Sequence, residues 1–237
     1  MHFTNNSVLG KVRKVSPRSI ALLVLVSAFA FSTSVMARHR HHMSGSALGQ
    51  FDYYVLSLSW SPAFCLQSPD ATECRGPRHY GFIVHGLWPQ REQGWPENCA
   101  GAQLSVPDPV AQSIADVMPS RGLIDHEWSA HGTCSGLDPD AYFALVRRAF
   151  QSVVIPAQVA RPAREVEEAP AAIIAQFLQS NPAFQPESAV VICSGQSVPR
   201  LREVRLCLSR DLAPRACSAQ ALRQACRAPS VIVPPIR

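Results

Sequence analysis

Lysine is almost absent from this chain of 237 residues, because the two lysines, Lys11 and Lys14, both lie near the N-terminus. All later positive charge comes from arginine, with histidine adding to it on protonation. Residues 1–37 hold four of the 22 basic residues and none of the 17 acidic ones. The rest of the chain therefore has 18 arginines against 17 acidic residues, a net charge of +1. The sequence pI of 8.9 is thus poor evidence for a polyanionic partner.

Several catalytic motifs are also missing. No two cysteines have the C-x-x-C spacing that is typical of dithiol redox and zinc sites. No G-x-S-x-G segment could place a nucleophilic serine on a strained turn. The cysteine count, eight, is even, so complete pairing leaves no thiol to act as a nucleophile. These absences argue against redox, serine and thiol chemistry.

The N-terminus has the pattern of a secretory signal peptide. A basic stretch precedes an apolar run over residues 20–31, which is too short for a comfortable membrane span. Small residues at Val35 and Ala37 predict cleavage after residue 37. We expect residues 38–48 to be a disordered tail and residues 49–237 to form one catalytic domain, with no membrane segment in the mature protein. A monomer in the periplasm or outside the cell is expected.

All eight cysteines follow this segment, as expected for four disulfides in an oxidising compartment. Spacing alone allows 105 pairings. It suggests a local bridge between Cys65 and Cys74, which bracket a polar loop. Nested bridges near the C-terminus, over residues 193–226 and 207–217, would staple the last hairpin.

Strand and helix patterns are interspersed along the domain without regular βαβ alternation. β-Forming residues predict strands over residues 51–60, 80–88, 189–193, 203–209 and 231–233, the last as a short edge strand. Helical spacing of apolar residues predicts helices over residues 109–118, 138–152 and 171–178, with a surface connection over residues 155–170. The predicted fold is α+β, with a mostly antiparallel central β-sheet and packed helices in a single disulfide-stabilised domain.

The segment HEWSAHGTC, which begins at His126, concentrates ionisable side chains. Asp125 is a good N-cap and Gly132 a natural stop, so a short helix is expected between them. Glu127 and His131, four residues apart, would then share one face of that helix. One such residue alone is usually a solvated or structural group. Three of them beside a cysteine indicate a chemical role.

Zinc hydrolysis is a weak candidate for that role. His126 and His131 are five residues apart, whereas H-E-x-x-H places its two zinc ligands four apart on one helical face. A distant third ligand could come from His85. Metal-free acid–base catalysis fits better, because one imidazole can accept a proton near neutral pH while another donates one. The natural substrate for such a pair is a phosphodiester with an internal hydroxyl nucleophile, which is RNA.

Two segments, FIVHGLWPQ over residues 82–90 and HEWSAHGTC over residues 126–134, resemble the active-site segments of the ribonuclease T2 family. WPENC, over residues 95–99, and the cysteine-rich C-terminal part also fit. The likeness covers about residues 50–227, and the first strand is most similar to the bacterial, periplasmic ribonuclease I-like branch. It implies an α+β fold, no metal or other cofactor, RNA as substrate, low base specificity and a cyclic 2′,3′-phosphate product.

The resemblance also implies a role for each matching residue. His85 matches the general acid that protonates the leaving oxygen, and His131 matches the general base. Glu127 matches the carboxylate that polarises the phosphate, and His126 the histidine that anchors it. Trp88 matches an aromatic residue of a base-binding site, where stacking is worth about 1–3 kcal/mol per base.

The family's cystine pattern implies the same local and nested bridges, together with one more across the site segments. The implied pairs are Cys65–Cys74, Cys99–Cys134, Cys193–Cys226 and Cys207–Cys217.

One position departs from the family pattern. The second segment usually reads H-E-W-x-K-H, with a lysine thought to stabilise the transition state, and here that residue is Ala130. An arginine such as Arg78, Arg91 or Arg121 would have to replace it. Loss of a charged contact of this kind costs about 2–4 kcal/mol in the barrier. The alternative is therefore a weakened or inactive protein that keeps the fold and acts by binding RNA or a partner.

Overall fold

The computed structural model describes residues 48–101, 105–195 and 198–236. The predicted signal peptide and all but the last residue of the predicted N-terminal tail lie outside these residues. Within them, no helix has the length and apolar character needed to cross a membrane.

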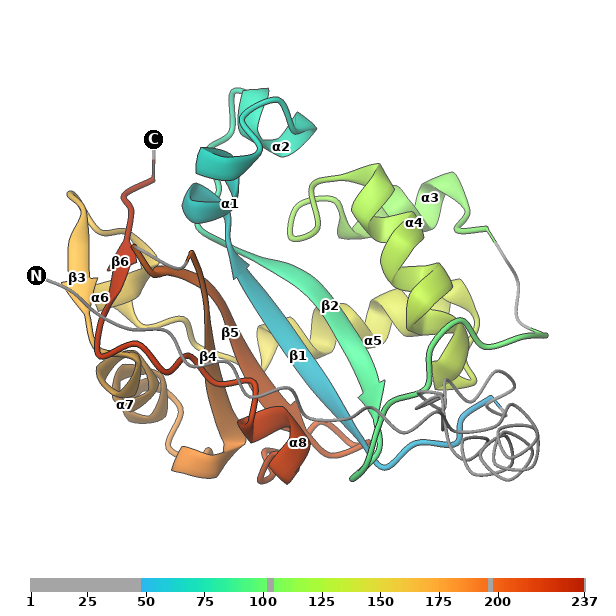
Figure 1. Ribbon diagram of the computed structural model, residues 1–237. Helices are drawn as coiled ribbons and strands as arrows, with labels where there is room; N and C mark the ends of the chain where they lie inside the picture. Colours follow the sequence, from blue (N-terminus) through green and yellow to red (C-terminus); the bar gives the residue numbers. More distant parts are fainter. Residues whose placement is uncertain (1–47, 102–104, 196–197, 237) are drawn as a thin grey trace, which may run out of the picture. The chain divides into compact units, whose positions relative to one another are not determined.

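A six-stranded sheet forms the centre of the described domain (Figure 1). Its main path runs β2-β1-β5-β6-β3, and β4 pairs with β5 beside that path. Every pairing is antiparallel except the short contact between β5 and β6, so the predicted α+β fold with a mostly antiparallel sheet is confirmed. The strands are β1 (Tyr53–Trp60), β2 (Phe82–Gln90), β3 (Val166–Glu168), β4 (Ala189–Ser194), β5 (Arg200–Leu208) and β6 (Val231–Val233).

Strand β1 is covered on both faces, and only Ser59 is partly exposed. Leu56, Leu58 and Trp60 belong to the main core, whereas Tyr53 and Val55 join a smaller cluster on the opposite face. Successive side chains thus alternate between the two clusters and attach the strand to both. Full burial of a large apolar side chain contributes about 1.5–3 kcal/mol of stability.

Helix α5 (Pro139–Gln151) passes behind β1 and β2 and covers the main-core face (Figure 1). The Asp138 side chain accepts a hydrogen bond from the amide of Ala141, and Pro139 occupies the first turn, as predicted. Tyr142 and Val146 are fully buried on its inner face. The remaining helices are α1 (Ser61–Gln67), α2 (Thr72–Arg75), α3 (Asp108–Ile114), α4 (Arg121–Ala130), η1 (Gly132–Ser135), α6 (Ala157–Ala160), α7 (Pro170–Ser180), η2 (Pro186–Ser188) and α8 (Ala219–Leu222).

Three local predictions were wrong. Cys65 and Cys74 do not bracket a simple loop: they lie within the short helices α1 and α2, which the sequence pattern did not indicate. The connection predicted over residues 155–170 contains strand β3, and β3 pairs with β6, so β6 is not an edge strand. Strand β3 has only three residues, which are too few to show a strand periodicity in the sequence.

The third error concerns the start of helix α4. Its N-cap is Ser120, whose hydroxyl accepts from the amide of Leu123, and not Asp125. Asp125 lies inside the helix, one turn after Arg121, and forms an i,i+4 ion pair with it. The helix ends at Ala130, before the expected stop at Gly132.

All four implied disulfides are present: Cys65–Cys74, Cys99–Cys134, Cys193–Cys226 and Cys207–Cys217. The second joins the loop after β2 to the turn after α4, so it ties together the two segments that carry the candidate site.

Candidate active site

A β-bulge places His85 at the site. The pairing of β1 with β2 passes from Ser57 opposite Gly86 to Leu58 opposite Val84, which leaves His85 as the extra residue. Bulges bend a strand and redirect a side chain, and they occur frequently beside active sites. His85 is consequently partly exposed within a strand that is otherwise mostly buried.

The next residue, Gly86, allows the strand and helix α4 to approach closely. A Cβ atom added there would lie 2.1 Å from Oε2 of Glu127 and 2.2 Å from Nε1 of Trp88. Any side chain at this position would displace the hydrogen bond between those two residues. Residue 86 must therefore be glycine, because there is no room for a side chain.

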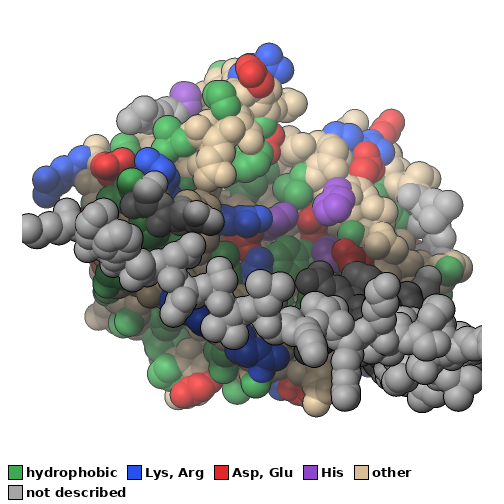
Figure 2. Space-filling view, viewed as in Figure 1, with side chains coloured by type: hydrophobic (Ala, Val, Ile, Leu, Met, Phe, Trp, Pro, Cys, Tyr) green, Lys and Arg blue, Asp and Glu red, His purple; other side chains and the backbone are tan. Residues whose placement is uncertain are grey.

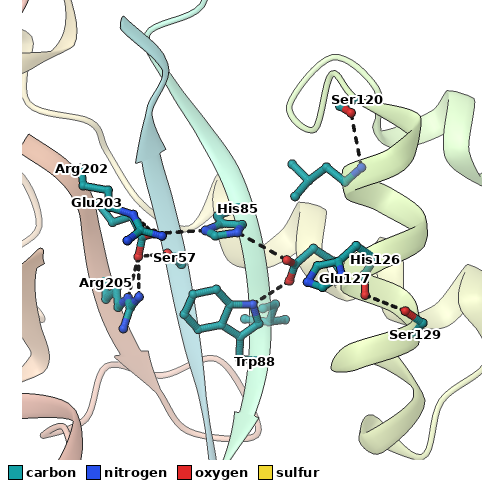
Figure 3. A network of polar contacts seen from close by, with 12 residues as sticks. Ser57, His85, Trp88, Ser120, His126, Glu127, Ser129, Arg202, Glu203 and Arg205 are labelled. Atoms are coloured by element: carbon teal, nitrogen blue, oxygen red, sulfur yellow. Dashed lines mark hydrogen bonds and ion pairs between the residues drawn. The ribbon is translucent and has the colours of Figure 1, made fainter. Parts of the chain in front are cut away.

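Helix α4 presents Glu127 to the strand. Its carboxylate is 1% exposed, and Oε2 accepts a 2.6 Å hydrogen bond from Nε1 of Trp88. Oε1 lies 3.5 Å from Nε2 of His85 (Figure 3). Burial raises the pKa of Glu127 to about 7, although the charge of His85 and the hydrogen bond from Trp88 lower it in part. Glu127 is therefore mostly a neutral carboxylic acid below pH 7.

His131 follows the last helical residue and faces Trp88, with the two ring centroids 5.4 Å apart. Burial, together with smaller contributions from nearby His126 and His85, lowers the pKa of His131 to about 3. Its Nδ1 is buried without a hydrogen-bond partner among the described residues. His131 is thus a neutral imidazole at any ordinary pH.

On the side of His85 away from Glu127 lies a second carboxylate, Glu203 of β5. Its Oε1 is 3.2 Å from Nδ1 of His85, and the side chain is fully buried. Arg202 and Arg205 form ion pairs with the same carboxylate, at 3.2 Å and 2.6 Å. The hydroxyl of Ser57 donates a further hydrogen bond of 3.1 Å. His85 therefore lies between two buried carboxylates (Figure 3).

A cavity of about 230 Å³ opens beside this network. Trp88, Trp95, His131, Arg205 and Gln224 are among its lining residues. The guanidinium of Arg205 lies 4.8 Å from the ring centroid of Trp88, a cation–π distance. Figure 2 shows histidine, acidic and arginine side chains gathered near the centre of this face. Aromatic and polar groups of this kind suit a planar ligand with hydrogen-bonding edges.

The sequence model of the ribonuclease T2 family matches residues 51–217. The chain belongs to the ribonuclease T2 family. The match includes both segments that form the site and all of the sheet's long strands.

Curated ribonucleases are similar to the chain over part of their length. A ribonuclease of Aeromonas hydrophila is 39% identical over 153 residues, which is 64% of this chain and 66% of that protein. Ribonuclease I of Escherichia coli is 31% identical over 175 residues, which is 56% of this chain and 64% of that protein. The chain thus spans slightly less than two thirds of the length of these relatives.

Solved structures show the same fold. The RNase-related protein from Calystegia sepium superposes with a TM-score of 0.64 at 21% identity, covering 79% of this chain and 98% of that one. A variant of RNase MC1 in complex with 5′-UMP gives a TM-score of 0.56 at 25% identity, covering 68% of this chain and 89% of that one.

The structure brings together four of the five residues that the T2 resemblance singled out. His85, Trp88, Glu127 and His131 contact one another in one network. His126 is the exception: it is exposed on α4, with its carbonyl oxygen accepting from the hydroxyl of Ser129. It contributes charge near His131 rather than a contact.

Ala130, at the position of the family's lysine, is only 3% exposed. Its carbonyl oxygen accepts a 2.8 Å hydrogen bond from the amide of Asn98, in the loop that Cys99 anchors. Of the arginines considered as substitutes, Arg121 is paired with Asp108 and Asp125, and Arg91 donates to the carbonyl of Gln50.

The third, Arg78, lies over the ring of Tyr80. The arginines that do reach the network, Arg202 and Arg205, were missed. So was Glu203. Little in the sequence pointed to Glu203, because it lies between Arg202 and Val204 at the first position of the strand predicted over residues 203–209.

Proposed function

We propose that this protein is an endoribonuclease that cleaves single-stranded RNA without a metal ion, by transfer of the phosphoryl group to the neighbouring 2′-oxygen. The observation that carries the proposal is the network in which His85 contacts Glu127. The ring of Trp88 lies beside both His85 and His131, so it joins the two histidines. The network combines a neutral imidazole, a protonated carboxyl group and a second imidazole held by the Glu203 carboxylate, and His131 and Trp88 also line the neighbouring cavity of about 230 Å³.

His131 is the proposed general base. Since its pKa is about 3, it is unprotonated at ordinary pH and can accept the proton of the 2′-hydroxyl. Its Nδ1 is buried, so this role falls to Nε2. The 2′-oxygen then attacks phosphorus and the bond from phosphorus to the 5′-oxygen breaks.

His85 is the proposed general acid. Its protonated Nε2 transfers a proton to the departing 5′-oxygen, which leaves as a hydroxyl group. The other product ends in a 2′,3′-cyclic phosphate. One proton has moved to His131 and one has left His85, so exchange with water restores both histidines.

Glu127 has a pKa of about 7 and is proposed to donate a hydrogen bond from its protonated carboxyl group to a phosphoryl oxygen. A donor placed where negative charge develops stabilises the transition state. His126, which is exposed on α4 next to Glu127, is proposed to anchor the phosphate.

The cavity beside Trp88 is the proposed site for a base. Arg205 covers the Trp88 ring, so the partly exposed Trp95 is available for stacking in the same cavity. Side-chain amides and stacking without a fixed hydrogen-bond pattern agree with low base specificity.

The four disulfides and the N-terminal sequence pattern support a periplasmic or extracellular location. The absence of the family's lysine supports a reduced rate. The competing function, binding of RNA or a partner without cleavage, is favoured by that same absence.

RNA cleavage by the oxidised protein in the presence of EDTA separates these functions. We expect the wild-type protein to cleave, and expect His131→Ala and His85→Ala to lose most of the activity while their thermal unfolding stays cooperative. Cleavage no faster than that of His131→Ala would leave only the binding function.

A further inference from the structure

We propose that Glu203 is a positioning residue for His85: its carboxylate holds the Nδ1–H of the imidazole, so that Nε2 is the nitrogen that delivers a proton to the leaving oxygen. This role rests on the ribonuclease function proposed above. Glu203 lies on strand β5, outside the two motif segments.

The contact has the geometry of an orienting hydrogen bond. Nδ1 of His85 and Oε1 of Glu203 are 3.2 Å apart, and Glu203 is 0% exposed. Nε2 of the same ring points toward Glu127, 3.5 Å from its Oε1 (Figure 3). A partner on one imidazole nitrogen decides which nitrogen carries the proton in the neutral ring. Glu203 thereby aims the reactive nitrogen.

The surroundings keep Glu203 ionised. Burial alone would raise the pKa of this carboxyl group, but the hydrogen bond with His85 and the charge of Arg205 outweigh burial and hold the pKa at about 2. Arg205 donates to Oε2 through Nε at 2.7 Å, and Ser57 adds a neutral donor to the same oxygen. A carboxylate with these donors accepts hydrogen bonds and does not supply protons.

The two carboxylates beside His85 therefore differ in protonation. The pKa of Glu127 is raised to about 7, and the pKa of Glu203 is lowered to about 2. Such a separation of pKa values is expected when neighbouring carboxyl groups have different tasks. Among the described residues, the other charged or titratable groups near this cluster include His131 after α4, Tyr142 of α5 and Arg202 on β5. Between pH 3 and 7 the Nδ1 side of His85 meets an anion and the Nε2 side a neutral acid.

A purely structural role would make Glu203 only the counter-ion of Arg202 and Arg205. That role predicts lower stability on substitution but no defined tautomer of His85. The tautomer is therefore the decisive property, and it can be measured without any substrate.

The first experiment records the imidazole ¹⁵N shifts of the full chain, expressed for export and purified in its oxidised form, with His85→Gln identifying the signals. The neutral His85 ring is expected to carry its proton on Nδ1. A ring protonated on Nε2, or an even mixture of the two tautomers, would overturn the proposal. This result does not depend on ribonuclease activity, so it separates failure of this role from failure of the proposed function.

The second experiment compares kcat and KM of Glu203→Gln and Glu203→Asp with those of a matched control, Glu92→Gln, which removes an exposed ion pair with Arg215. Glu203→Gln should lower kcat at least about tenfold with little change in KM, because a misaligned acid impairs the chemical step. Glu203→Asp should restore part of kcat.

Equal kcat values for Glu203→Gln and Glu92→Gln, or a change in KM alone, would contradict the role. If Glu203→Gln does not fold, the tautomer in the wild-type protein and the kcat of Glu203→Asp still decide it.

Discussion

At the scale of single residues, the site is defined by environments that move titratable groups away from their usual ranges. Glu127 and His131 lie one helical turn apart, and burial favours the neutral form of both. Glu203 is just as deeply buried but keeps its charge because arginine and histidine donors surround it. The same physical factor, removal from water, therefore gives opposite results according to the partners present.

The raised pKa of Glu127 has a consequence for stability that is independent of activity. A folded-state pKa of about 7, against 4.5 in the unfolded chain, contributes stability below pH 4.5 that is lost as pH rises through 7. The loss amounts to about 3 kcal/mol. Relative to wild type, Glu127→Gln should therefore gain stability between pH 4.5 and 8, as measured by urea unfolding. The titration of His131, which runs in the opposite direction, cancels in this comparison. A difference that stays constant with pH would contradict the assignment.

Ala130 gives a second prediction at this scale. Because the residue is 3% exposed, Ala130→Lys should lower the free energy of unfolding by about 1–3 kcal/mol through crowding. If the missing cation limits the rate, kcat should rise about tenfold or more. Ala130→Met, of similar length and no charge, is the control: it should share the loss of stability without the gain in kcat. An equal kcat for the two variants would show that the cation is not limiting.

At the scale of secondary-structure elements, the contact between β2 and α4 sets the site. The sequence identifies His85 as the middle of a strand, but the bulge that turns it toward α4 depends on the register with β1, which no local pattern encodes. For the same reason the sequence does not reveal Glu203 as a partner of His85, since 118 residues separate them. The motif residues themselves could be found because each carries its own chemistry.

Gly86 tests this contact directly. Gly86→Ala places a methyl group within 2.9 Å of three Glu127 and Trp88 atoms, so the hydrogen bond between these residues should break. We expect kcat to fall at least about tenfold, together with a loss of about 1–3 kcal/mol in stability from overpacking. Gly94→Ala is the control for loss of glycine, because its added Cβ meets nothing within 4 Å, although its positive φ brings some strain of its own. Wild-type kcat in Gly86→Ala would show that the two elements need not be in close contact.

Two of the disulfides should differ in their effects on stability and activity. The Cys99–Cys134 bridge closes 35 residues and holds the turn after His131, whereas Cys65–Cys74 closes only nine. Loop-closure entropy predicts losses of about 4 and about 3 kcal/mol when each is replaced by a serine pair. Activity should fall only in the Cys99→Ser/Cys134→Ser variant, when assayed well below both unfolding temperatures. Equal activity in the two double variants would exclude a role of the first bridge in placing His131.

At the scale of the whole molecule, the sequence was sufficient for the α+β fold and for the long strands β1, β2, β4 and β5. The complete set of four disulfide pairs came from the family resemblance, since spacing alone did not suggest Cys99–Cys134. Sequence patterns failed where segments are short or where an element is defined by its partner. Helices α1 and α2 have seven and four residues, and β3 has three. Strand β3 exists through its pairing with β6, which is a tertiary contact. Charge at the site was misjudged for the same reason, because Arg202 and Arg205 reach the site only through the order of strands in the sheet.

The central claim is that the nucleophile is the 2′-hydroxyl group of the substrate, activated without a metal ion. The most direct measurement uses a DNA oligonucleotide that contains one ribonucleotide, incubated with the oxidised protein and EDTA. We predict a single cut on the 3′ side of the ribonucleotide, a 2′,3′-cyclic phosphate on one fragment, and no cut in the all-DNA strand. Cleavage of the all-DNA strand, cleavage that EDTA abolishes, or no cleavage at the ribonucleotide would contradict the account.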